Sequence, residues 1–225
     1  MKNLNLKAFG GLFFLVLVLA LALFIPAGTL NYWQAWGFLA VWTVAVLAIT
    51  LYLMRRDPGL LERRVEAGPV AEQERSQKII QALASLAFIV MFILPALDHR
   101  FGWSSVPLCV VVVGDILVAF GLYYVFLVFK ENTFTSAVIA VGAEQKIITS
   151  GPYAVVRHPM YAGAFIMLFG VPLSLGSWWG LLPVIPMMAV IVWRLLEEEK
   201  FLVKNLAGYV RYRKMVKYRL IPFIW

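Results

Sequence analysis

The chain has 225 residues, of which 62% are hydrophobic and only 14% are charged, whereas a soluble domain is about half apolar. This composition excludes an ordinary soluble domain and indicates a protein embedded in lipid. The formal net charge of +8 requires no nucleic-acid partner, because basic cytoplasmic loops and attraction to anionic headgroups account for it. We therefore expect membrane lipids, and no nucleic acid, as partners.

Apolar segments long enough to cross a membrane recur along the chain. Roughly 30 Å of hydrocarbon requires about 20 helical residues. The segments run over residues 8–25, 34–54, 79–97, 106–129, 161–175 and 181–196. They predict an all-α integral membrane protein with about six (five to six) transmembrane helices.

Two of these segments allow another interpretation. The first follows Lys2 and Lys7 as a signal peptide would, but its apolar core is longer than usual, which favours a retained helix. The segment 161–175 is short and contains Gly163, Gly170 and Pro172; it either crosses the bilayer or forms half of a re-entrant hairpin.

The basic residues predict the orientation. If all six segments cross, every Lys and Arg except Arg100 falls on one side, and such residues accumulate in cytoplasmic loops. We expect cytoplasmic termini and, as the location, the cytoplasmic membrane of a prokaryote.

The polar regions divide the single membrane domain into two parts. Residues 1–130 hold four spans and, after the second, a polar loop with a short interfacial helix at residues 60–66. Residues 131–225 hold a strand-like stretch at 146–149, a turn at 150–152, the sequence RHPMY at 157–161, a helical hairpin and a C-terminal interfacial segment.

Two groupings in the second part could carry chemistry. Pro159 suits the first turn of a helix, whose exposed N–H groups can hold an anion; a basic cap at the membrane boundary is an equally good interpretation. Arg194 and Glu198 have the spacing that places both on one helix face. They form either an ordinary ion pair or a site for a polar headgroup. Cys109 and the two histidines, His99 and His158, do not form a metal-ligand pattern, so we expect no metal.

Three stretches, taken in order, carry a family resemblance. IITSGPYAVVRHPMYAG at 147–163, RLLEEEKFL at 194–202 and YVRYRKMVKYRLIPFI at 209–224 resemble the isoprenylcysteine carboxyl methyltransferase family and its phospholipid methyltransferase relatives. The resemblance covers roughly the last 90 residues. It implies an integral membrane enzyme that uses S-adenosylmethionine, bound between a cytoplasmic cap near the C-terminus and the ends of the last helices.

The resemblance also implies roles for individual residues. The cofactor contacts would be Gln145, Lys146, Ile147, Ile148, Tyr153, His158, Pro159, Met160 and Tyr161. Arg194 and Glu198 would orient the substrate, with Glu197 as the alternative to Glu198. Val138 and Ile139 stand where the family often has a polar residue.

The expected function is S-adenosylmethionine-dependent methyl transfer to a membrane-embedded lipid or lipidated, isoprenoid-like acceptor, with carboxyl O-methylation favoured. One alternative is an NADPH-dependent membrane sterol or enone reductase, whose downstream Cys and Lys-Tyr-Gly pattern this chain lacks. The other is a non-enzymatic lipid-binding or transport bundle, which would show repeat symmetry or more polar residues at mid-membrane.

Overall fold

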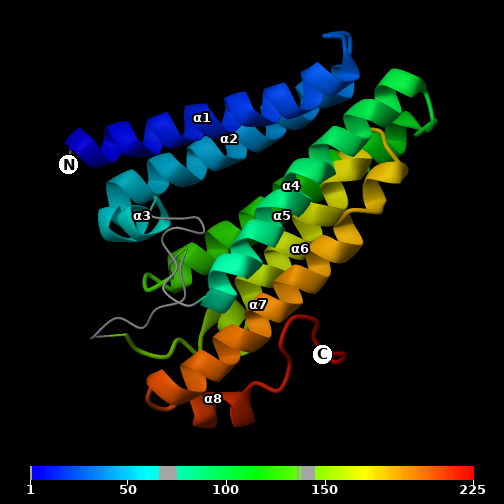
Figure 1. Ribbon diagram of the computed structural model, residues 1–225. Coiled ribbons are helices and arrows are strands. Elements are labelled where there is room, and N and C mark those ends of the chain that lie inside the picture. The colour runs from blue at the N-terminus through cyan, green and yellow to red at the C-terminus, as the bar shows by residue number, and fades with distance from the viewer. Residues whose placement is uncertain (1, 66–74, 136, 138–144) are drawn as a thin grey trace.

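The computed structural model describes residues 2–65, 75–135, 137 and 145–225 (Figure 1). All regular structure in these ranges is helical. Five helical segments are long and apolar enough to cross a membrane. They correspond to α1 (Lys2–Ala27), α2 (Trp33–Arg56), α4 (Arg75–Phe101), α5 (Leu108–Glu131) and α7 (Val184–Asn205). The predicted all-α membrane fold is confirmed.

Helix α6 (Pro159–Ser174) is shorter than the others but runs from one end of the bundle to the other (Figure 1). It starts at the RHPMY end, beside the end of α5. Just beyond its last residue, the Leu175 carbonyl accepts a 2.7 Å hydrogen bond from the Tyr32 hydroxyl, which lies between α1 and α2. The Ser177 hydroxyl donates to the buried Asp98 near the end of α4. The helix therefore crosses the bundle and does not turn back halfway.

Glycines explain how α6 fits so tightly against α5. Gly114 and Gly121 of α5 face Gly163 and Gly170 of α6, and a Cβ atom built on Gly121 would lie 2.7 Å from the Gly163 carbonyl oxygen. Small residues let two membrane helices approach until their backbones touch. This seam fixes the start of α6, and with it the RHPMY sequence, relative to the end of α5.

The remaining helices complete a bundle whose outer surface is apolar. Helix α1 packs on α4, and α2 packs on α5. Phe38 and Phe92 meet in the core with their ring centroids 5.5 Å apart. Phe13 and Phe14 of α1, by contrast, are 71% and 66% exposed, as expected where lipid is the solvent.

Three short helices gather at the RHPMY end of the bundle. They are α3 (Pro58–Val65), the 3₁₀ helix η1 (Gly151–Ala154) and α8 (Tyr209–Met215). Helix α3 corresponds to the predicted interfacial helix, of which Glu66 lies outside the described residues. The stretch 146–149, predicted to be strand-like, is irregular; in the described chain no strand pairs with it, and an extended segment needs such a partner.

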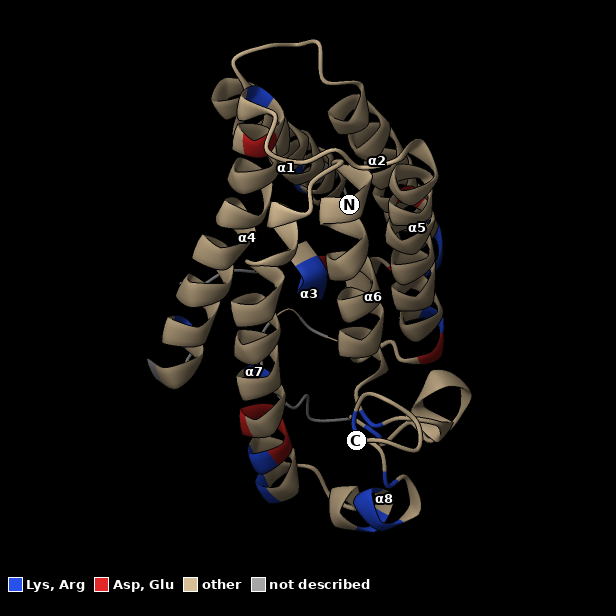
Figure 2. Ribbon diagram, turned by 90° about the vertical axis from the view of Figure 1, so that its right-hand side faces the viewer, with Lys and Arg blue, Asp and Glu red and all other residues tan. Residues whose placement is uncertain are grey.

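Charged residues also gather at this end. In Figure 2, basic residues colour α8, and both acidic and basic residues colour the last turns of α7, whereas most of the length of the long helices is uncharged. This distribution is consistent with the predicted orientation, which stays a prediction.

Candidate functional site

The RHPMY sequence lies where the C-terminal tail folds back onto the start of α6. His158 is the N-cap residue and Pro159 is the first residue of the helix, where its missing N–H costs nothing. The backbone N–H groups of Arg157 and His158 donate to the carbonyls of Tyr218 and Arg219 at 2.9 and 3.0 Å. The tail therefore occupies two of the N–H groups near the helix start, where the sequence predicted that an anion could bind. Within the helix itself, the N–H groups of Met160 and Tyr161 have no intrahelical acceptor.

Glu199 is the electrostatic centre of this region. Its Oε1 lies 2.6 Å from Arg157 Nε and 3.4 Å from His158 Nε2, and its Oε2 lies 3.0 Å from Arg219 Nε. Arg157 also donates from Nη1 to the carbonyls of Val216 and Lys217, at 2.9 and 2.7 Å. The carboxylate thus connects α7, the RHPMY sequence and the tail.

Sequence reasoning did not single out Glu199. It considered the run Glu197 to Glu199 but assigned the functional role to Glu198, or to Glu197. Only the fold brings Glu199, rather than its neighbours, against Arg157. The one available signal was that Glu199 follows Glu198 directly and so projects from another part of the helix surface.

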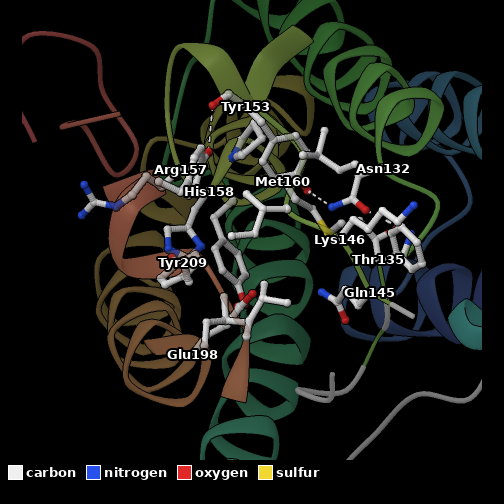
Figure 3. Close-up of a pocket in the computed structure, with 18 of the residues that line it drawn as sticks. Asn132, Thr135, Gln145, Lys146, Tyr153, Arg157, His158, Met160, Glu198 and Tyr209 are labelled. Atoms are coloured by element: carbon white, nitrogen blue, oxygen red, sulfur yellow. Dashed lines mark hydrogen bonds between the residues drawn. The ribbon is translucent and has the colours of Figure 1, made fainter. Parts of the chain in front are cut away.

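A pocket opens between the start of α6, the end of α7 and the segments before η1 (Figure 3). It encloses about 900 Å³ of empty space, including its open mouth. All of the predicted site residues line it: Gln145, Lys146, Ile147, Ile148, Tyr153, His158, Pro159, Met160, Tyr161, Arg194 and Glu198. The structure therefore brings together residues from widely separated positions, while their roles stay predictions.

Other lining residues were not predicted. They are Asn132, Phe134, Thr135, Arg157, Leu202, Leu206, Tyr209 and Tyr212. Residues 132–135 follow α5 directly, and no local sequence pattern indicates that Asn132, Phe134 and Thr135 line the pocket. Val138 and Ile139, noted for their departure from the family pattern, lie outside the described residues.

Two oxygens in the pocket are buried and have no hydrogen-bond partner among the residues that the structure describes. They are Thr135 Oγ1 and the Tyr209 hydroxyl oxygen. A buried polar group without a partner costs about 1–3 kcal/mol, and such groups are rare in folded proteins. Two of them in one pocket indicate that the pocket is built for a polar ligand.

The acidic side of the pocket is positioned by tyrosine. The Tyr161 hydroxyl donates a 2.6 Å hydrogen bond to Glu198 Oε2. Arg194, one helical turn before Glu198, donates from Nη2 to the Ala137 carbonyl at 2.9 Å and from Nη1 to Gln77 at 3.3 Å. A carboxylate and a guanidinium are therefore both held at the pocket wall.

Tyr153 connects the residues just after α5 with α8. Its hydroxyl accepts a 2.9 Å hydrogen bond from Asn132 Nδ2, and its carbonyl accepts a 2.8 Å hydrogen bond from the Tyr212 hydroxyl. Burial raises the pKa of Tyr153, and it also raises the pKa of Tyr209. Both phenols therefore remain protonated, and able to donate, across the neutral range.

Within the described residues no group of three or more His, Cys, Asp and Glu side chains could hold a metal ion.

Comparison with known proteins gave two matches. The model of the phospholipid methyltransferase family matches residues 109–208, which run from the start of α5 to the residue before α8. Protein-S-isoprenylcysteine O-methyltransferase B of Arabidopsis thaliana is 29% identical over 154 residues, covering 65% of this chain and 72% of that protein. The family match includes the glycine seam, the RHPMY sequence and the Arg194 to Glu199 segment.

Proposed function

Because this chain is an isoprenylcysteine carboxyl methyltransferase-like membrane protein, as its C-terminal motifs predicted, we propose that it uses S-adenosylmethionine to methylate a lipid acceptor. The acceptor is a membrane-embedded lipid or a lipidated, isoprenoid-like molecule, and the favoured reaction is carboxyl O-methylation. The observation that carries the proposal is that all the predicted site residues line one pocket, in which two buried oxygens lack partners.

The chemistry of the pocket fits this cofactor. S-adenosylmethionine has a carboxylate, an ammonium group, ribose hydroxyls and an adenine ring. The N–H groups at the start of α6 suit the carboxylate, and Thr135 and Tyr209 offer unused hydrogen-bonding capacity to the polar groups. Phe134 and Ile147 provide apolar wall for the ring.

When bound, the cofactor supplies a methyl group on a sulfonium, and transfer of such a group needs alignment more than a strong base. The residues therefore act mainly by position. His158 is held by its neighbour Glu199, 3.4 Å away, so the imidazole forms a fixed wall of the pocket. The Tyr161 hydroxyl holds the Glu198 carboxylate so that it cannot turn freely toward solvent.

Arg194 and Glu198 would orient the acceptor. A guanidinium binds a carboxylate through paired hydrogen bonds, so Arg194 can present an acceptor carboxylate to the methyl group while keeping it ionised. Glu198 can accept from an N–H group of the same acceptor. The name of the Arabidopsis relative, which refers to an isoprenylcysteine acceptor, supports a lipidated carboxylate as substrate.

Calorimetric titration of the purified protein tests the proposal. S-adenosylmethionine and its demethylated product should bind saturably, and His158→Ala or Glu198→Gln should weaken binding or turnover. Phe223→Ala, at an 86% exposed position away from the pocket lining, is the matched control. Saturable binding of NADPH, together with no heat of binding from S-adenosylmethionine or its demethylated product, would overturn the proposal in favour of a reductase.

A further inference from the structure

A second groove lies on the outer side of α7, separate from the mouth of the pocket. It is formed by the end of α7 and by residues of α8 and the tail. Its basic lining residues are Lys200, Lys204, Arg213 and Arg219, and its apolar ones include Trp193 and Leu196. Figure 2 shows basic residues gathered on the end of α7 and on α8, the two helices that border the groove.

The groove carries an excess of positive charge although it also contains two carboxylates. Glu197 is paired with Lys200 at 2.7 Å. Glu199 is occupied by Arg157 and Arg219 and is 4% exposed. The carboxylates are thus already neutralised by the protein's own cations.

The other cations keep unused hydrogen-bonding capacity. In the part of the chain that the structure describes, the side-chain nitrogens of Lys204 and Arg213 have no hydrogen-bond partner, and Arg219 uses only Nε, toward Glu199. The Arg219 guanidinium also lies 5.2 Å from the centre of the Trp225 ring. Several donors therefore face one groove without a protein acceptor.

Beside these donors the groove continues onto the membrane-spanning part of α7. Trp193 is 39% exposed, and it stands just before the helix changes from apolar to charged residues. Tryptophan favours the boundary between hydrocarbon and headgroups, and basic side chains just beyond that boundary attract anionic lipids. An anionic headgroup would meet the cations while an acyl chain lies along Trp193 and Leu196.

We propose that this groove binds one anionic phospholipid, with the phosphate among Lys204, Arg213 and Arg219. A soluble phosphorylated molecule would use the cations but not the apolar wall, which is why a lipid is the better occupant. Because Arg219 shares Glu199 with Arg157, the lipid would also fix the tail against the RHPMY sequence. This inference goes beyond the methyl transfer proposed above and does not depend on it.

The test compares lipids on the full-length protein in a neutral detergent. Native mass spectrometry should show saturable binding of one phosphatidylglycerol and much weaker binding of phosphatidylcholine. The Lys204→Gln and Arg213→Gln double variant should lower the phosphatidylglycerol affinity about thirtyfold. The control is Arg55→Gln with Arg56→Gln, two exposed cations at the end of α2, which should leave the affinity unchanged.

Further measurements separate the alternatives. Circular dichroism checks that each variant is folded, and the charge-reversed Lys204→Glu and Arg213→Glu variant should lose saturable binding altogether. Inorganic phosphate at millimolar concentration should not displace the lipid. Equal binding of both lipids, equal losses in the control pair, or full displacement by phosphate would each overturn the proposal.

Discussion

Arg157 Nε and Glu199 Oε1 lie 2.6 Å apart, and both side chains are 5% exposed. This buried pair joins the RHPMY sequence to α7, and through Arg219 it also holds the C-terminal tail. Removing one partner of a buried pair leaves an uncompensated charge, which costs more than the pair itself contributes.

Glu199→Gln should therefore destabilise the protein by about 3 kcal/mol and release the tail. Unfolding in sodium dodecyl sulfate, followed by circular dichroism, measures the first effect, and limited proteolysis near Lys217 measures the second. The matched control is Glu197→Gln, whose partner Lys200 is 69% exposed; there we expect a change below about 0.5 kcal/mol. Similar effects of the two substitutions would contradict the central position of Glu199.

The unpartnered oxygens of Thr135 and Tyr209 lead to an unusual expectation. Thr135→Val and Tyr209→Phe should leave the ligand-free protein as stable as before, or slightly more stable, because neither oxygen has a hydrogen bond to another described residue. Each should nevertheless weaken S-adenosylmethionine binding about fivefold, since a hydrogen bond contributes about 1 kcal/mol. Calorimetry and thermal unfolding measure the two quantities.

Tyr32→Phe is the control for that pair. The Tyr32 hydroxyl donates to the Leu175 carbonyl at 2.7 Å, far from the pocket, so its removal should cost about 1 kcal/mol of stability and leave the affinity alone. If Thr135→Val and Tyr209→Phe bind the cofactor as the wild type does, those oxygens do not serve the ligand.

Tyr161→Phe should slow methyl transfer. The substitution removes the 2.6 Å hydrogen bond to Glu198, and a hydrogen bond to a charged group contributes about 1.5–3 kcal/mol, so we expect turnover to fall by tenfold or more. Tyr123→Phe, at a 55% exposed position on α5, should have no effect. An unchanged rate for Tyr161→Phe would show that Glu198 needs no such support.

The glycine seam predicts a steric effect. Gly121→Ala places a Cβ atom 2.7 Å from the Gly163 carbonyl oxygen and 2.7 Å from the Met167 nitrogen. Because both are backbone atoms, the helices must separate, at a cost of about 1–3 kcal/mol. Gly11→Ala in α1 meets nothing within 4 Å and should stabilise its helix by about 0.5–1 kcal/mol. Unfolding in sodium dodecyl sulfate measures the change in the free energy of unfolding for both variants.

The predicted orientation can be tested with cysteine labelling. In a Cys109→Ser background, Ser105→Cys, between α4 and α5, should react with a membrane-impermeant maleimide in intact cells. Lys217→Cys, in the tail, should react only after the cells are lysed. Labelling of Lys217→Cys in intact cells would show that the orientation is the opposite of the predicted one.

Composition and local motifs were enough to predict that this protein lies in a membrane and that its C-terminal part resembles a methyltransferase family. Length and hydropathy decide whether a segment can cross a bilayer, so the long spanning helices follow from local composition alone. The residues of RHPMY and of the segment after Arg194 were recognisable because their order along the chain is local information. The family resemblance that these motifs carry also predicted many of the residues that line the pocket.

Which of the three adjacent glutamates faces which partner could not be predicted, because it depends on the packing of the folded chain. Neighbouring positions on a helix point about 100° apart, so the choice between Glu198 and Glu199 depends on how α7 is rotated against the tail. The same holds for α6, whose crossing depends on glycines that are far apart in sequence. Thr135 and Tyr209 line the same pocket although they lie far apart in the sequence, and no local pattern encodes such a long-range arrangement.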